Sequence, residues 1–271
     1  MAYQRSFLKW AGSKYQLLAP ILAHLPPGKR LLEPFAGSGV VFLNTNYPRY
    51  LLNDINADLI GIYQCLKQHG QSFIHDVKAF FTPENNTKER YLELRQRFNL
   101  SSDRYERALL FIYLNRHGFN GLCRYSRQGF NVPFGRHYST RFPEKAMMLF
   151  YQKLQKTVLH HKHYSDIFRL ANPGDVIYCD PPYIVNHPSS AFHYFGIPFT
   201  LTDQQQLAAL ALEKQHQGVT VLISNHATNI TKQLYQHAKT IHLLQAYRSM
   251  NRYPAERRMV EELLAVYSIE Q

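Results

Sequence analysis

Cysteine is scarce in this sequence, and its three cysteines stand far apart. Cys65, Cys123 and Cys179 include no close pair, so the spacing needed for a thiolate metal site or a disulfide framework is missing. The histidines within residues 160–163 also lack a second set of ligands at a suitable spacing. We therefore expect no bound metal, no disulfide, and a compartment in which thiols stay reduced.

Long apolar runs are missing too. None approaches the roughly 20 residues that cross a bilayer, and residues 1–12 have neither the apolar stretch nor the cleavage site of a signal peptide. Apolar residues still make up 45% of the 271-residue chain, which is ample for a globular core. These features predict a cytoplasmic protein that has no membrane partner.

Acidic residues are outnumbered. The chain has 19 Asp and Glu against 31 Lys and Arg, which gives a formal net charge of +12. Residues 86–145 hold twelve of the basic residues and five acids, and residues 116–141 hold five arginines, five Phe or Tyr and no acid. Basic side chains neutralise phosphates, and interleaved aromatic rings stack on bases or wedge between them. We expect this segment to bind a nucleic acid; the alternative is a solvated basic face whose aromatic residues belong to the core.

Two common phosphate-binding patterns are absent. No Gly-Lys-Ser/Thr loop occurs, and Phe42 stands where a dinucleotide-binding pattern would need its last glycine. The turn EPFAGSG (33–39) still predicts a close backbone approach to a ligand, because it joins a predicted strand to a predicted helix. Asp54 ends the next predicted strand, where a carboxylate can accept both hydroxyls of a ribose; the alternative is a helix N-cap. A ribose site without a diphosphate site indicates a nucleoside such as S-adenosylmethionine.

Strands and helices alternate near both ends of the chain. Residues 29–45 predict a strand, a glycine turn and a helix, and residues 50–56 predict a strand that leads into a helix from about Asn56. After about residue 146 the alternation resumes, with a helix predicted at 203–217 and strands predicted at 157–161, 175–180, 219–224, 240–247 and 259–267. The chain is therefore predicted to form an α/β scaffold that is interrupted by an insert.

The insert is predicted to be mainly helical. Residues 56–117 have helical patterns, and residues 106–118 predict an amphipathic helix that ends at its final glycine. Residues 122–136 predict a β-hairpin that turns at Gln128-Gly129. The basic and aromatic cluster falls on this hairpin and on the helix before it.

An acid followed by two prolines and a tyrosine ends the predicted strand at 175–180. Pro181 and Pro182 can neither complete a ladder hydrogen bond nor start a helix, so Asp180 and Tyr183 are held at the end of the sheet. The exocyclic amine of adenine is a poor nucleophile because its lone pair is delocalised into the ring. The Asp180 carboxylate and the Pro181 carbonyl could accept its two hydrogens, which would localise the lone pair as a methyl sulfonium is attacked. The ring of Tyr183 could stack on the base, and no base of tuned pKa is needed because the proton can leave after transfer.

Six motifs, in this order, resemble the Dam-type DNA adenine-N6 methyltransferases of bacteria. They are FLKWAGSK (7–14), EPFAGSG (33–39), NDIN (53–56), NRHGFNGLCRY (115–125), NVPFG (131–135) and CDPPY (179–183). The resemblance runs from about residue 7 to residue 267. It implies an α/β fold with a Rossmann-like mixed-sheet methyltransferase domain over residues 1–55 and 146–271, and a target-recognition domain over residues 56–145. We expect a monomer that acts on the DNA of the nucleoid.

The resemblance also assigns residues to the cofactor and to the chemistry. The positions that match S-adenosylmethionine-binding residues are Trp10, Lys14, Asp54 and Asp180, with Phe35, Gly37 and Asp166 lining the same pocket. The positions that match the catalytic turn are Asp180, Pro181, Pro182 and Tyr183.

For the insert, the resemblance implies that it reads GATC in double-stranded DNA and flips the adenine out of the stack, as chemistry on a paired base requires. The base-reading positions are matched by Lys9, Leu122, Arg124 and Pro133, and the position that supports the orphaned partner base is matched by Asn120. Phe119 and His137 stand where the nearest relatives carry Tyr; Phe119 suits a ring that wedges into the stack, and His137 falls in a DNA-contacting segment. We assign Arg116 and Arg127 to phosphates, and for Arg124 a phosphate contact is the alternative to base reading.

Other functions remain open on this fold. One is methylation of an adenine in RNA, and another is methylation of a glutamine amide, which the acid at Asp180 disfavours. A third is a DNA-binding regulator without catalytic activity. The complete set of Asp54, Asp180, Tyr183 and the glycine turn argues against a regulator, because a silent copy would not need all of them.

Overall fold

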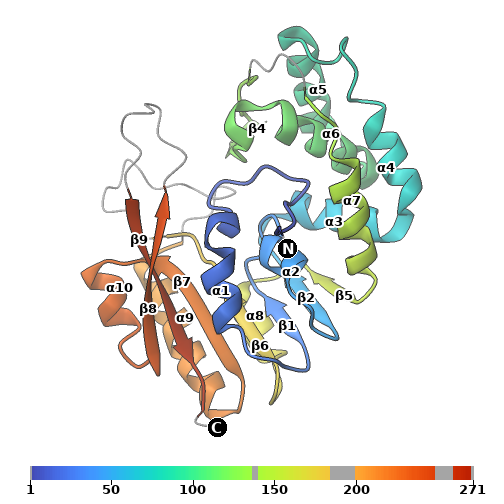
Figure 1. Cartoon of the computed structure of the whole chain (residues 1–271). Coiled ribbons are helices and arrows are strands. Elements are labelled where there is room, and N and C mark those ends of the chain that lie inside the picture. The colour runs from blue at the N-terminus through green and yellow to red at the C-terminus, as the bar shows by residue number, and fades with distance from the viewer. Residues whose placement is uncertain (1, 136–139, 184–198, 248–258, 270–271) are drawn as a thin grey trace.

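The computed structural model describes residues 2–135, 140–183, 199–247 and 259–269 (Figure 1). Its centre is a seven-stranded sheet in the order β5-β2-β1-β6-β7-β9-β8. These strands are Thr157–His160, Tyr50–Asn53, Leu31–Glu33, Val176–Cys179, Thr220–His226, Met259–Tyr267 and Thr240–Tyr247. The neighbours from β5 to β7 pair in parallel, whereas β9 pairs antiparallel with both β7 and β8. The predicted mixed α/β sheet is confirmed.

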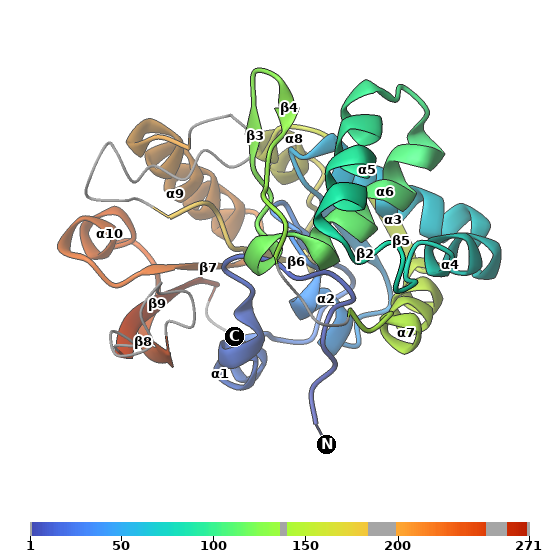
Figure 2. The same cartoon turned by 90° about the horizontal axis from the view of Figure 1, so that it is seen from above.

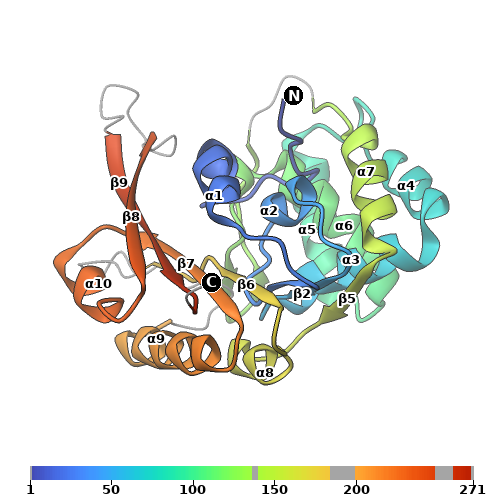
Figure 3. The same cartoon turned by 60° about the horizontal axis from the view of Figure 1, so that its bottom comes forward.

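Helices cover both faces of this sheet. The inner strands β1, β2 and β6 are buried throughout, which parallel strands require because their crossover connections lie on the faces. Leu32 and Ile177 pack with α8 (Tyr164–Arg169) and α9 (Leu201–His216) on one face. Figure 3 shows α1 (Leu18–His24) and α2 (Val40–Asn44) on the opposite side of the sheet. Alternate residues of each strand thus supply two separate cores.

The first strand ends in the turn that the glycines predicted. Gly37 and Gly39 have φ values of 48° and 63°, and Gly39 is the N-cap residue of α2. These left-handed conformations favour glycine because a side chain is strained there. The turn therefore lies at the carboxyl edge of the parallel strands, where ligands of α/β proteins bind.

The insert packs as a cluster of helices beside the sheet. It comprises α3 (Ala57–His69), α4 (Gln71–Lys78), α5 (Lys88–Leu100) and α6 (Arg104–His117), followed by a 3-10 turn, η2 (Phe119–Gly121), and the start of α7 (Glu144–Leu154). The helix α6 is buried on nearly all sides, since residues 110–115 are all buried. The sequence predicted an amphipathic helix there, but α6 packs against α3, α4 and α5 and so has little solvent face.

The hairpin consists of β3 (Tyr125–Ser126) and β4 (Gly129–Phe130), and Figure 2 shows it standing above the sheet. Ser126 pairs with Gly129, so the turn residues are Arg127 and Gln128, one position earlier than predicted. Gly129 has a positive φ of 100°, as a turn glycine would, but it is the first residue of β4 and not a residue of the turn. There its missing side chain leaves room for Asn99, which binds the Phe130 amide.

The hydrophobic core is continuous between the sheet and the insert. A single cluster includes Leu31 and Tyr178 of the sheet and Phe98 and Phe111 of the insert helices. The division into residues 1–55 with 146–271 and residues 56–145 stays a prediction.

Candidate active site at the carboxyl edge of the sheet

Asp180 follows β6 directly and is paired with a buried lysine. The Nζ of Lys14, which is 5% exposed, lies 2.9 Å from Asp180 Oδ1 and donates to the Gly12 carbonyl at 2.8 Å. Burial raises the pKa of the Asp180 carboxyl, and the Lys14 charge opposes this rise. The ammonium thus stabilises the ionised carboxylate at the end of the strand. The two residues are 166 positions apart, and only the fold brings them together.

Tyr183 is fixed by a residue that the sequence did not single out. Its hydroxyl donates to Glu262 Oε2 at 2.8 Å, and the Nζ of Lys14 lies 3.9 Å from the same oxygen and 4.7 Å from the centre of the Tyr183 ring. The ring of His226 contacts Tyr183 edge-on, with centroids 4.4 Å apart. His226 on β7 pairs with Glu262 on β9, so this neighbourhood depends on the antiparallel strand. The sequence did not single out Glu262, because β9 contains two adjacent acids, Glu261 and Glu262, in a mainly apolar strand.

The two prolines have different surroundings. The Pro182 carbonyl accepts a hydrogen bond from Gln204 Nε2 at 2.8 Å. Within the described part of the chain, the Pro181 carbonyl accepts none. Next to the Asp180 carboxylate there is therefore an acceptor to which none of the described residues donates a hydrogen bond.

Asp54 lies beside the glycine turn. Its Oδ2 accepts from the Gly37 amide and its Oδ1 from the Asn56 amide, both at 3.0 Å. Burial raises its pKa to about 6, although these backbone hydrogen bonds oppose the rise. The N-cap of α3 is Asn56, whose side chain binds the Leu59 amide, so the alternative of Asp54 as a helix N-cap is wrong. A carboxylate has about four acceptor positions, so Asp54 can still accept a hydrogen bond from a ligand.

Aromatic rings line the same edge. Trp10 covers the turn so closely that a Cβ on Gly37 would lie 2.9 Å from Trp10 Nε1. Phe35 stacks on Tyr164 at 5.3 Å and meets Phe199 edge-on at 5.6 Å between ring centroids. Tyr164 and Phe199 were not predicted as part of the site, because a single aromatic residue in a helix or a loop gives no sign of what it will contact.

Asp166 is more exposed than the other residues assigned to the cofactor. Its side chain is 39% exposed and pairs with Arg169 at 2.7 Å. It lies in the first turn of α8, on the same helix as Tyr164. Its contact with the cofactor stays a prediction.

The start of the chain is joined to the end of α6. Lys9 and Asn115 exchange two hydrogen bonds, from the Lys9 amide to Asn115 Oδ1 at 2.9 Å and from Asn115 Nδ2 to the Lys9 carbonyl at 2.7 Å. Lys9 Nζ donates to the Arg116 carbonyl, and burial together with the Arg116 charge lowers the pKa of Lys9 to about 8. Gly121 packs on the Lys9 backbone so tightly that any side chain there would collide with it. Lys9 is therefore held against the insert.

Phe119 and Asn120 form an exposed corner of the insert. Phe119 is 46% exposed, and its amide donates to the Pro133 carbonyl at 2.9 Å. Asn120 is exposed and has a left-handed φ of 53°. The structure thus brings Phe119, Asn120 and Pro133 together, whereas Leu122 is half buried against the core.

Arg124 and Arg127 lie on the exposed hairpin. The guanidinium of Arg124 donates from Nε to Asn131 Oδ1 at 2.7 Å and from Nη2 to the Asn131 carbonyl at 3.1 Å. Arg127 occupies the turn itself, whereas Arg116 is half buried and donates to the Arg141 carbonyl. His137 lies outside the described residues.

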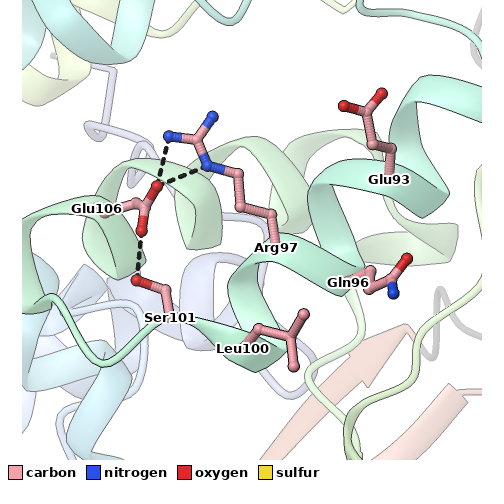
Figure 4. Close-up of a pocket in the computed structure, with 6 residues that line it drawn as sticks. All are labelled: Glu93, Gln96, Arg97, Leu100, Ser101 and Glu106. Atoms are coloured by element: carbon pink, nitrogen blue, oxygen red, sulfur yellow. Dashed lines mark hydrogen bonds and ion pairs between the residues drawn. The ribbon is translucent and has the colours of Figure 1, made fainter.

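A hollow between α5 and α6 is a separate feature. It is lined by Glu93, Gln96, Arg97, Leu100, Ser101 and Glu106. Figure 4 shows Glu106 binding both Arg97 and Ser101, so these polar groups satisfy one another. None of the residues assigned to the cofactor, to catalysis or to DNA lines this hollow.

Two further findings concern metals and membranes. Among the residues that the structure describes, no group of three or more His, Cys, Asp or Glu is placed to hold a metal ion. In the same ranges, no helix is long and apolar enough to cross a membrane.

Comparison with known proteins identifies the family. Residues 10–250 match the model of the D12 class N6 adenine-specific DNA methyltransferases. A DNA adenine methylase of Vibrio cholerae is 48% identical over 99% of this chain and 98% of its own length, and one of Escherichia coli K12 is 45% identical over 98% and 96%. Among solved structures, a precorrin 8w decarboxylase of Methanobacterium thermoautotrophicum aligns with 94% of this chain and 90% of its own at 11% identity, with a TM-score of 0.38. The family match and the full-length relatives show that this chain belongs to the D12 class of N6 adenine-specific DNA methyltransferases.

Proposed function

We propose that this chain moves a methyl group from S-adenosylmethionine to N6 of an adenine flipped out of duplex DNA, within the sequence GATC. The observation that carries the proposal is the catalytic turn, Asp180 to Tyr183, placed at the same sheet edge as Asp54 and Gly37. The protein would act as a monomer on DNA in the cytoplasm.

The pocket beside the glycine turn fits a nucleoside. Asp54 presents a buried carboxylate that can accept from a ribose, and Trp10 and Phe35 present ring surfaces. Gly37 has no side chain, so the Trp10 ring can lie directly against the turn. Asp166, Asp180 and the Lys14 ammonium complete the residues that would hold the cofactor. When bound, S-adenosylmethionine supplies an electrophilic methyl group.

The catalytic turn would activate the adenine amine. One amine hydrogen donates to the Asp180 carboxylate, which can still accept a bond while Lys14 holds Oδ1, and the other donates to the Pro181 carbonyl. These two acceptors favour the tetrahedral nitrogen whose lone pair attacks the methyl carbon as the carbon–sulfur bond breaks. The methylated nitrogen then loses a proton. Tyr183, held by Glu262, presents its ring to the base.

The insert would recognise the DNA. Phe119 is an exposed ring suited to entering the stack that adenine leaves, and Asn120 beside it would support the orphaned base. Lys9, Leu122, Arg124 and Pro133 are assigned to the bases, while Arg116, Arg127 and His137 are assigned to the backbone. Arg124 already donates two hydrogen bonds to Asn131. To bind a guanine, its guanidinium must use the N–H groups that are left or break these bonds.

Transfer of labelled methyl groups tests this proposal. The protein is incubated with labelled S-adenosylmethionine and a random-sequence duplex pool, and the modified sites are then mapped. We expect N6-methyladenine within GATC. Matched single-stranded RNA is the control, and preferential labelling of RNA, of another duplex sequence, or of nothing would contradict the proposed substrate.

A further inference from the structure

Three polar side chains are completely buried behind the catalytic turn. Gln204 of α9, Asn225 of β7 and Tyr235 after α10 (Asn229–Leu234) are each 0% exposed. Asn225 Nδ2 donates to Gln204 Oε1 at 3.1 Å and to the Tyr235 hydroxyl at 3.0 Å, and the Tyr235 hydroxyl donates to Gln204 Oε1 at 2.7 Å. Burying polar groups costs free energy unless they are hydrogen-bonded to one another. We therefore ask what these three polar side chains do in the core.

The cluster fixes the direction of one amide. Because Gln204 Oε1 accepts two hydrogen bonds from Asn225 and Tyr235, the amide cannot flip without losing both. Gln204 Nε2 is therefore directed outward as a donor, and it binds the Pro182 carbonyl at 2.8 Å. The Asn225 amide is oriented in turn, because its Oδ1 accepts from the His226 backbone amide at 2.9 Å.

The catalytic turn needs an anchor of this kind. Pro181 and Pro182 have no backbone N–H, so these two residues can be held by hydrogen bonds only through their carbonyl oxygens. The Pro181 carbonyl is the one proposed to bind the substrate amine, which leaves the Pro182 carbonyl as the point of attachment. His226, whose amide is bound by Asn225, packs on the Tyr183 ring, so the same cluster supports both sides of the turn.

We propose that Gln204 is a positioning residue that holds the Pro182 carbonyl, and that Asn225 and Tyr235 orient its amide for this purpose. This inference rests on the proposed function of the turn. Without the hydrogen bond, the peptide units that present Asp180 and the Pro181 carbonyl can shift relative to the amine. Because reactivity falls steeply with such displacements, the loss should appear in the transfer step rather than in binding.

Two substitutions test the role of the donor. Gln204→Leu removes it and keeps the approximate volume. Gln204→Glu keeps the shape and the acceptor oxygen, but it replaces the amide nitrogen with a second oxygen, which has no hydrogen to donate when ionised and regains one when protonated. Gln205→Leu is the matched control, because Gln205 is the exposed neighbour on the same helix.

The measurement is the single-turnover rate of methyl transfer on whichever adenine-containing duplex the wild type methylates. We expect the rate of Gln204→Leu to fall by about 100-fold, with the dissociation constants for DNA and cofactor changed by less than about threefold. For Gln204→Glu, the rate relative to wild type at the same pH should recover as the pH is lowered. Gln205→Leu should keep the wild-type rate.

Several outcomes would overturn the inference. One is a wild-type rate in Gln204→Leu, and another is a Gln204→Glu deficit that stays constant with pH. A loss of binding equal to the loss of rate would also reject a positioning role. If Gln204→Leu does not fold, Gln204→Glu alone decides through its pH profile. A wild-type protein that methylates no DNA would instead reject the proposed function.

Discussion

At the scale of single residues, two neighbours of Asp180 explain how its carboxylate could bind the adenine amine. Lys14 stabilises its negative charge, and the Pro181 carbonyl, which accepts no hydrogen bond from the described residues, provides a second acceptor beside it. Sequence reasoning found Asp180 from the prolines that follow it and Lys14 from a family motif. It did not find Glu262, because nothing local indicates that an acid in β9 will meet Tyr183.

Replacing Asp180 with alanine should abolish transfer and leave duplex binding intact. We expect the single-turnover rate to fall by about 10³-fold or more, because an acceptor for the developing charge is lost. Duplex affinity should stay within about threefold, since phosphate contacts in the insert supply most of it. A rapid-quench measurement alongside a binding titration checks both. Glu144→Ala, which removes an exposed acid, is the control; near-normal transfer in Asp180→Ala would contradict the proposed chemistry.

Cofactor affinity should depend on the protonation of Asp54. Burial raises its pKa to about 6, so the carboxylate that would accept the ribose hydroxyls is ionised above that pH and neutral below it. We expect the cofactor dissociation constant to rise as pH falls below about 6, by up to about tenfold per pH unit. Calorimetric titrations from pH 5 to 8 measure this. Asp54→Asn should bind weakly at every pH, and equal affinity of the wild type at pH 5 and 8 would count against the ribose contact.

At the scale of elements, the hairpin carries two arginines with different expected roles. Arg124 is held by Asn131, which directly follows β4, whereas Arg127 lies exposed in the turn. An arginine fixed on a ribbon suits the reading of bases in a groove, and one at an exposed turn suits a phosphate. Replacing each arginine should therefore have a different effect on DNA binding and on the choice of sequence.

Replacing Arg124 with alanine should reduce discrimination between sequences. A guanidinium that grips guanine contributes roughly 1–3 kcal/mol against the wrong base. We therefore expect slower methylation of GATC and a relative gain on sites altered at one G·C pair. Single-turnover rates on GATC and its one-base variants measure the ratio. A uniform decrease on all of them would assign Arg124 to a phosphate instead.

Replacing Arg127 with alanine should weaken DNA binding without changing the choice of sequence. Loss of one phosphate contact should reduce the slope of log affinity against log salt concentration by about 0.9. Adding Arg116→Ala should flatten the slope further, by less than Arg127→Ala does, because Arg116 is half buried and already bonded to the Arg141 carbonyl. Binding titrations over a salt series test both, with Arg90→Ala on α5 as a control, because Arg90 is paired with Glu93. An unchanged slope in the double variant would place these arginines away from DNA.

At the scale of the whole molecule, a buried acid links stability to pH. Glu33 ends β1, is 2% exposed, and burial raises its pKa to about 8 from 4.5. The folded state therefore holds a proton that the unfolded state releases above pH 4.5. Its contribution to stability is largest below that pH and is lost as the pH rises towards 8.

Replacing Glu33 with glutamine should remove this dependence. We expect the free energy of unfolding of the wild type to fall relative to Glu33→Gln between pH 5 and 8, by at most about 1.4 kcal/mol per pH unit. Asp54 also titrates in this range but is present in both proteins, so its contribution cancels. Denaturant unfolding at several pH values gives the difference, with Glu89→Gln, an exposed acid, as the control. A difference that is constant with pH would mean that Glu33 stays ionised in the fold.

The sequence by itself determined the features that depend on local chemistry. Two prolines after Asp180 must end a strand because they lack N–H groups, and Gly37 and Gly39 permit positive φ where β1 turns into α2. Short apolar runs predicted the strands of the sheet, and the glycine turn predicted the helix that follows the first strand. These conclusions held because each depends on residues adjacent along the chain.

Only the tertiary structure decided which distant residues meet. The order of strands places β9 beside β7, which brings Glu262 and His226 to Tyr183, and the crossover to α9 puts Gln204 behind Pro182. It also shows that Asn56, not Asp54, caps α3, and that the hairpin turns at Arg127 and Gln128. The periodicity of apolar residues indicates which side of a helix or strand is buried. It does not indicate which other element packs against that side. The pairing of Lys14 with Asp180 therefore follows from the packing of the whole chain.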